Sequence, residues 1–167
     1  MKKIVIIGST GSIGTQALDV CDINKSEFEV YGITAGKNLD KLKTQIIKYK
    51  PKYYDNLDNH DFQLGNSILI DSQKLVVDEN VDFVLFASSG SSAYIPIFES
   101  IKHGKDIGLT NKEVIVTYGP LLLHESKKNK SKVFPIDSEP SAIWQCIDGD
   151  NREVSKLILT ASGGAFR

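Results

Sequence analysis

The chain has 167 residues, with 20 basic and 21 acidic side chains and a formal net charge of −1. This length predicts about one domain with a sizeable core, and the 41% apolar composition is typical of ordinary globular proteins. The balanced charge leaves no broad basic surface for a nucleic-acid backbone, which disfavours a nucleic-acid binder. No apolar run approaches the ~18 residues of a membrane-spanning helix, so we expect no membrane insertion.

The N-terminal apolar run is too short for a secretory signal, and the two cysteines are isolated from each other. Cys21 and Cys146 are therefore expected to be buried thiols in a reducing compartment. The cytoplasm is the default location, although a plastid-type organelle protein that had lost its transit peptide would have the same sequence features.

Buried strand patterns alternate with amphipathic helical patterns along the chain. In chain order, the patterns predict a strand over 2–7, a helix from 13 to 21, a strand over 28–34, a helix over 39–49, short elements at 67–70 (strand) and 74–79 (helix), a strand over 81–87, a helix over 92–103, a strand over 106–109, helices over 111–118 and 120–129, and strands over 133–136 and 156–161. The stretch 52–66 is polar and weakly patterned. Trp144 lies on a further helical pattern and is expected to pack in the core. Such strand–helix–strand repeats predict an α/β fold, a Rossmann-like, mostly parallel sheet with helices on both faces.

A glycine-rich loop follows the first predicted strand and leads directly into a helix. It reads Gly-Ser-Thr-Gly-Ser-Ile-Gly over residues 8–14. Three glycines at this spacing permit a tight turn, close approach of a phosphate to the backbone, and close packing of helix on strand. The helix N-terminus offers unpaired N–H groups to a pyrophosphate. The loop therefore predicts a dinucleotide site, with a glycine-rich turn that binds no ligand as the other interpretation.

The end of the second predicted strand indicates which dinucleotide is bound. An NAD-specific site usually has an acidic residue there, which binds the ribose 2′-hydroxyl. This chain has Gly36, Lys37 and Asn38 instead. A cation and an amide suit a 2′-phosphate, which favours NADPH over NADH, unless Lys37 is simply a solvated lysine. The segment 87–90 ends another strand and could shape the same crevice, or could be an ordinary Ser/Gly turn.

An acidic loop follows the last strand of this series. Asp137 and Glu139 lie two residues apart at a strand end, where a bend can direct both carboxylates to one hard cation such as Mg²⁺ or Mn²⁺. Taken alone, the same pair is more often a solvated acidic pair or a helix cap. The context of the other motifs favours the metal interpretation.

These motifs occur in a single order: the glycine loop, then residues 36–38, Thr-Asn-Lys-Glu at 110–113, Pro-Ile-Asp-Ser-Glu at 135–139 and Leu-Thr-Ala-Ser-Gly-Gly at 159–164. As a set they resemble the 1-deoxy-D-xylulose 5-phosphate reductoisomerase family, the NADPH enzymes of the non-mevalonate isoprenoid pathway. The resemblance implies an NADPH-binding Rossmann-like domain over 1–136. It also implies that 137–167 contains the first elements of a second, α+β catalytic domain.

The resemblance also implies residue roles. The cofactor would be bound by Thr10, Gly11, Ser12, Ile13, Gly36, Lys37, Asn38, Asn111 and Glu113. Asp137 and Glu139 would bind Mg²⁺ or Mn²⁺. The sugar-phosphate substrate would be contacted by Lys112, Ser138, Glu139 and Ser162, with Lys112 and Glu139 as the catalytic residues.

By this resemblance, the full-length enzyme would rearrange and reduce 1-deoxy-D-xylulose 5-phosphate to 2-C-methyl-D-erythritol 4-phosphate, and we expect it to be a homodimer. Family members are more than twice as long and supply a third carboxylate ligand downstream. The chain is therefore expected to be an N-terminal fragment without turnover of its own.

Two other functions remain open from the sequence. One is an NADP-dependent reductase of the short-chain or semialdehyde type, although Tyr118 has no lysine four residues later and Cys146 has no histidine nearby. The other is a non-catalytic nucleotide-binding module.

Overall fold

The computed structural model describes residues 1–56, 60–88, 93–147 and 154–158. These residues form a seven-stranded sheet in the order β4-β3-β2-β1-β5-β6-β7, and every strand pair in it is parallel. The strands are β1 (Lys2–Ile7), β2 (Phe28–Ala35), β3 (Tyr53–Asn56), β4 (Ile68–Leu69), β5 (Phe83–Phe86), β6 (Asp106–Leu109) and β7 (Val133–Pro135). The predicted Rossmann-like fold is confirmed.

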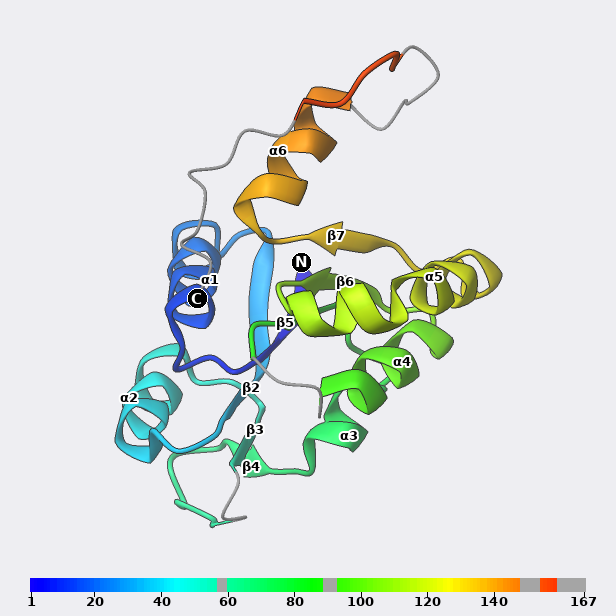
Figure 1. The fold of residues 1–167 in the computed structure, drawn as a ribbon. Coiled ribbons are helices and arrows are strands. Elements are labelled where there is room, and N and C mark those ends of the chain that lie inside the picture. The colour runs from blue at the N-terminus through cyan, green and yellow to red at the C-terminus, as the bar shows by residue number, and fades with distance from the viewer. Residues whose placement is uncertain (57–59, 89–92, 148–153, 159–167) are drawn as a thin grey trace, which may run out of the picture.

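Helices cover both faces of the sheet, and a last helix lies beyond its edge (Figure 1). They are α1 (Ser12–Ile23), α2 (Leu39–Tyr49), α3 (Ser72–Leu75), α4 (Tyr94–Lys102), α5 (Lys112–Asn129) and α6 (Ser138–Ile147). Within the described ranges, no helix is long and apolar enough to cross a membrane.

Two apolar cores lie on opposite faces of the sheet because successive side chains of a strand point to opposite sides. On β1, Ile4 and Ile6 pack against Leu18 of α1 and Leu42 of α2. Val5 between them joins the other core, which contains residues of α3, α4 and α5. A strand that is buried on both faces reads as a continuous apolar run, which explains why β1 was predictable from sequence.

The sheet order places a switch point between β1 and β5. The chain passes from β1 to β2 and β3 on one side, then returns to pair β5 with β1 on the other side. Ligands of open α/β sheets bind beyond the carboxyl ends of the strands at such a point. The glycine loop follows β1 directly, so it lies at this position.

The polar stretch after Pro51 contains a strand that the sequence pattern did not indicate. Tyr53–Asn56 forms β3 and pairs with β2. Tyr54 is fully buried, and its hydroxyl donates to Asp61 Oδ1 at 2.7 Å. The partner for its polar end comes from tertiary structure, so a polar sequence can still form an interior strand here.

Two helices expected around Pro120 are one continuous helix, α5, with Pro120 inside it. Proline removes the hydrogen bond to the carbonyl of residue 116. Val116 is 83% exposed, so this turn faces solvent and water can bind the carbonyl. Val114 and Leu122, before and after the proline, are both buried on the core side. Burial on either side keeps the helix continuous.

Other element boundaries also differ from expectation. The helix expected at 74–79 is the single turn α3, because the Asp71 side chain accepts from Gln73 N and starts it earlier. Of the strand expected over 156–161, residues 156–158 have no regular structure, and 159–161 lie outside the described residues.

Trp144 is 49% exposed and Cys146 is exposed, so their predicted burial is wrong, whereas Cys21 is buried as expected. The reason is that α6 has no buried residue. It projects past the sheet edge, and the Trp144 ring packs edge-on against Phe134, with 6.1 Å between centroids.

The tightest backbone approach in the fold yields a stability prediction. A Cβ atom on Gly14 would lie 2.3 Å from the Gly8 carbonyl oxygen, whereas one on Gly119 would meet nothing closer than 4.0 Å. We expect Gly14→Ala to lower the free energy of unfolding by about 1–3 kcal/mol, as overpacking does. The matched control, Gly119→Ala within α5, should be neutral or stabilising by up to about 1 kcal/mol. Urea unfolding followed by circular dichroism measures both. Equal effects of the two substitutions would contradict the packing argument.

Candidate functional site

The glycine loop forms a tight backbone cradle at the N-terminus of α1. Gly8 has φ +86°, a conformation that favours glycine, and its missing Cβ would lie 3.1 Å from backbone atoms of both Ala87 and Ser88. The loop therefore lies against the end of β5, at the switch point of the sheet. Larger residues at this position would separate β1 from β5.

The N-terminus of α1 offers unpaired donors. Gly11 is the N-cap residue, and no side chain among the described residues caps this end. The first-turn N–H groups of a helix have no partner inside the helix, and the helix dipole adds partial positive charge there. Ser12 and Ile13 supply two of these N–H groups. The chemistry of this arrangement suits a phosphate.

The segment 36–38 lies at the carboxyl end of β2, next to the glycine loop in the sheet order. Asn38 is the N-cap of α2, and its side-chain oxygen accepts from Lys41 N at 3.1 Å. Lys37 is exposed. The cation and the start of α2 therefore face solvent beside the loop, where the 2′-phosphate of a bound dinucleotide is expected.

The end of β6 leads into α5 through Asn111. This residue is 2% exposed; its Oδ1 accepts from Val114 N at 3.0 Å, and its amide nitrogen donates to Ser88 O at 3.3 Å. Asn111 thus caps α5 and connects it to the end of β5. Lys112 and Glu113 follow in the first turn of α5, and both are exposed.

Lys112 contacts the acidic loop after β7. Its Nζ lies 3.5 Å from Asp137 Oδ2, and the two side chains are 72% and 25% exposed. Ser138 Oγ donates to Glu139 Oε2 at 2.7 Å. This bond, followed by a backbone hydrogen bond and then the charge of Lys112, lowers the pKa of the Glu139 carboxyl below its ordinary value.

The acidic loop fits a hard divalent cation in donor type. Carboxylate oxygens are the ligands that Mg²⁺ and Mn²⁺ prefer, and both carboxylates lie at the carboxyl edge of the sheet. No group of three or more His, Cys, Asp or Glu residues that could hold a metal occurs in the part of the chain that the structure describes. Among the described residues, this loop thus supplies two carboxylates, Asp137 and Glu139, of the donor type that such a cation prefers.

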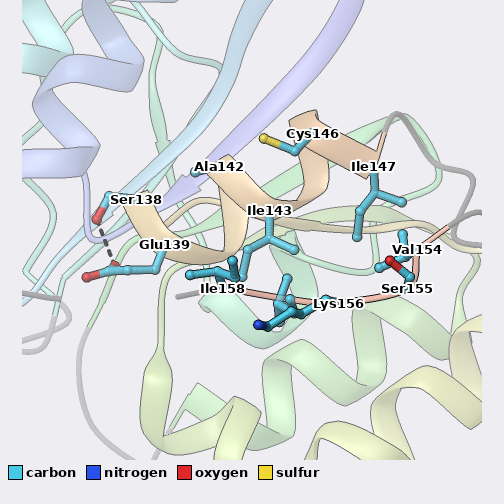
Figure 2. Close-up of a pocket in the computed structure, with 11 residues that line it drawn as sticks. Ser138, Glu139, Ala142, Ile143, Cys146, Ile147, Val154, Ser155, Lys156 and Ile158 are labelled. Carbon is cyan, nitrogen blue, oxygen red and sulfur yellow. Dashed lines mark hydrogen bonds between the residues drawn. The ribbon is translucent and has the colours of Figure 1, made fainter. Parts of the chain in front are cut away.

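A hollow of about 600 Å³ adjoins the acidic loop between α6 and the 154–158 segment. Figure 2 shows Ile143 and Ile147 of α6 directed towards this segment, with Ser138 and Glu139 at one end. One end is polar and the rest is lined largely by apolar side chains. This shape leaves the Glu139 carboxylate accessible to a small polar ligand.

The structure gathers most of the predicted site residues at one edge of the sheet. The glycine loop, residues 36–38, residues 111–113 and residues 137–139 follow β1, β2, β6 and β7 respectively, and the ion pair of Lys112 joins the last two groups. Ser162 and residues 89–90 lie outside the described residues.

Sequence reasoning missed residues of α2 that contact the glycine loop. Lys41 Nζ donates to Thr10 O at 2.9 Å, and Gln45 exchanges hydrogen bonds with Ser9. Their spacing of four residues, one helical turn, was the available signal. It had no meaning until the packing of α2 against the loop was known.

Comparisons with known proteins agree with this geometry. A family model described as 1-deoxy-D-xylulose 5-phosphate reductoisomerase matches residues 4–119. The model of the C-terminal domain of the same enzyme matches residues 133–167.

The reductoisomerase of Thermoanaerobacter pseudethanolicus is 44% identical over 177 aligned residues, covering 100% of this chain and 46% of the relative. That of Clostridium botulinum is 41% identical, covering 100% and 47%. A DOX-P reductoisomerase structure in complex with NADPH, fosmidomycin and magnesium superimposes with a TM-score of 0.83 at 29% identity, covering 90% of this chain and 41% of that one. The chain thus spans about half the length of the relatives that it matches. It belongs to the 1-deoxy-D-xylulose 5-phosphate reductoisomerase family.

Proposed function

We propose that this chain binds NADPH at the carboxyl edge of its sheet and contributes two carboxylates to a divalent-metal site. In the full-length protein, these would serve the conversion of 1-deoxy-D-xylulose 5-phosphate to 2-C-methyl-D-erythritol 4-phosphate. The observation that carries the proposal is the uncapped N-terminus of α1 at the β1–β5 switch point, with Lys37 at the end of the adjacent strand. A family member that was solved with NADPH and magnesium supports it.

The proposed division of labour follows the sheet order. Thr10, Gly11, Ser12 and Ile13 bind the pyrophosphate, and Gly36, Lys37 and Asn38 surround the 2′-phosphate. Asn111 and Glu113 flank the cofactor further along the edge. Bound NADPH would supply the hydride for the reduction. Residues 1–136 would form the cofactor domain, and residues 137–167 would belong to the catalytic domain.

Lys112 connects the cofactor side to the metal side. Its ammonium group is exposed and held near Asp137, so it can provide positive charge to a substrate oxygen that becomes anionic. A divalent ion held by Asp137 and Glu139 would act as a Lewis acid towards the substrate carbonyl and a neighbouring hydroxyl. Ser138 and Glu139 would contact the substrate, and Ser162 would approach its phosphate. Homodimerisation and a cytoplasmic location stay predictions.

Cofactor preference tests the first half of the proposal. NADPH should bind the 167-residue chain more tightly than NADH. Lys37→Gln should lower the NADPH affinity about tenfold, as expected for the loss of one contact to a charged phosphate, and leave the NADH affinity unchanged. Titration by cofactor fluorescence measures both affinities. Lys25→Gln, which removes a charge near the amino edge of the sheet, serves as the control. An equal loss for both cofactors would remove Lys37 from the 2′-phosphate site.

Metal binding tests the second half. We expect Mn²⁺ to bind the chain weakly and Asp137→Asn to abolish this binding, measured by electron paramagnetic resonance of free Mn²⁺. Lys112→Met should strengthen Mn²⁺ binding by up to about fivefold, because it removes a cation that competes for Asp137 in an exposed ion pair. Asp40→Asn, which changes an exposed carboxylate on α2, should have no effect. Unaltered Mn²⁺ binding by Asp137→Asn would refute the metal site.

A further inference from the structure

Two side chains of α2, which are one helical turn apart, form hydrogen bonds with the backbone of the glycine loop. Lys41 Nζ donates to Thr10 O at 2.9 Å. Gln45 Nε2 donates to Ser9 O at 2.9 Å, and Ser9 Oγ donates to Gln45 Oε1 at 2.7 Å. Both main-chain carbonyls between Gly8 and Gly11 are therefore bound by side chains of α2.

The Ser9–Gln45 pair is buried, so water cannot replace it. Ser9 is 0% and Gln45 5% exposed. Each partner both donates and accepts, and Ser9 N also donates to Thr34 O at 2.8 Å, which connects the loop to β2. A buried carbonyl left without a hydrogen-bond partner destabilises the fold by the full free energy of its desolvation. The pair thus fixes the orientation of the peptide groups in this part of the loop.

The same helix begins at the second proposed phosphate site. Asn38 is the N-cap of α2, so residues 36–38 lead directly into the helix that carries the side chains at positions 41 and 45. Contact of Lys41 and Gln45 with the loop sets the spacing between the loop and residues 36–38. NADPH bears two anionic groups, the pyrophosphate and the 2′-phosphate. The distance between the glycine loop and residues 36–38 must match the separation of these two groups.

We propose that Lys41 and Gln45 are positioning residues, which hold the glycine loop ready for the pyrophosphate and set its distance from the 2′-phosphate turn. This inference rests on the proposed function. The inference goes beyond the proposed function because it assigns a role to two residues that are not expected to touch the reacting atoms. A loop that is already ordered binds the cofactor more tightly, because no conformational entropy is lost in ordering it on binding.

The test compares ligands that use different parts of the site. Gln45→Met keeps the length of the side chain but removes both hydrogen bonds. It should lower the affinities for NADPH and NADH by the same factor, about tenfold, while that for 2′-AMP, which lacks the pyrophosphate, changes less than twofold. Ser9→Ala should have a smaller effect, because the bond from Gln45 Nε2 to the carbonyl of residue 9 remains. Lys41→Met should weaken NADPH and NADH binding alike, and Lys41→Arg should restore it.

Two matched controls separate positioning from general destabilisation. Lys43→Met removes a charge from the same helix where the side chain pairs with Asp40 at 3.5 Å, and it should leave the affinities unchanged. Ser100→Ala removes a fully buried hydroxyl on the opposite face of the sheet. It should lower the melting temperature without lowering the affinities. If Ser100→Ala weakens NADPH binding as much as Gln45→Met does, the positioning role is overturned.

A second readout needs no cofactor. In the ligand-free chain, amide hydrogen exchange of the peptide covering residues 5–16 should be faster in Gln45→Met and Lys41→Met than in the wild type, with exchange in β6 unchanged. Unchanged exchange in this peptide would overturn the inference. Failure of the wild-type chain to bind NADPH, with the exchange effect present, would instead contradict the proposed function and leave the loop restraint supported. A loss of affinity confined to NADPH and 2′-AMP would show direct phosphate contact and also overturn the positioning role.

Discussion

The arrangement of the site depends on one close backbone contact, between Gly14 in the first turn of α1 and the Gly8 carbonyl at the end of β1. There is no room there for even a single additional carbon atom. Because α1 can approach the strand end this closely, its unpaired N–H groups open directly onto the carboxyl edge of the sheet. The contact therefore determines both how α1 packs and where an anion can bind.

The parallel sheet places the other parts of the site along the same edge as the glycine loop. Parallel strands present all their carboxyl ends at one edge, and the order of the strands places the ends of β2, β1, β5, β6 and β7 in a row. Residues far apart in the sequence therefore meet without any special loop. The burial of Val5, Ile6 and Val84 in the centre of the sheet gives this edge a rigid base, whereas most of the residues proposed to bind ligands lie in the turns and helix starts that follow the strands.

The electrostatics of the edge change along its length. At the glycine loop, a helix N-terminus and Lys41 provide positive potential. At the other end, Asp137 and Glu139 provide negative charge, with Lys112 between the two regions and 3.5 Å from Asp137. An edge of this kind suits a dinucleotide at one end and a cation at the other. The nearly neutral net charge of the chain conceals this separation, because the opposite charges cancel in the sum.

The sequence by itself determined the alternation of strands and helices, the position of the glycine loop and the polarity of each strand end, because these depend on local periodicity and on backbone requirements. Tertiary structure decided the rest. Tyr54 makes an interior strand of a polar segment because Asp61 binds its hydroxyl, and burial on both sides of Pro120 keeps α5 in one piece. Likewise, Lys41 and Gln45 read as ordinary polar helix residues until α2 packs against the loop. Lys41 and Gln45 bind residues that lie 31 and 36 positions earlier in the sequence, and the other two contacts form only when the chain packs. No local pattern therefore encodes them.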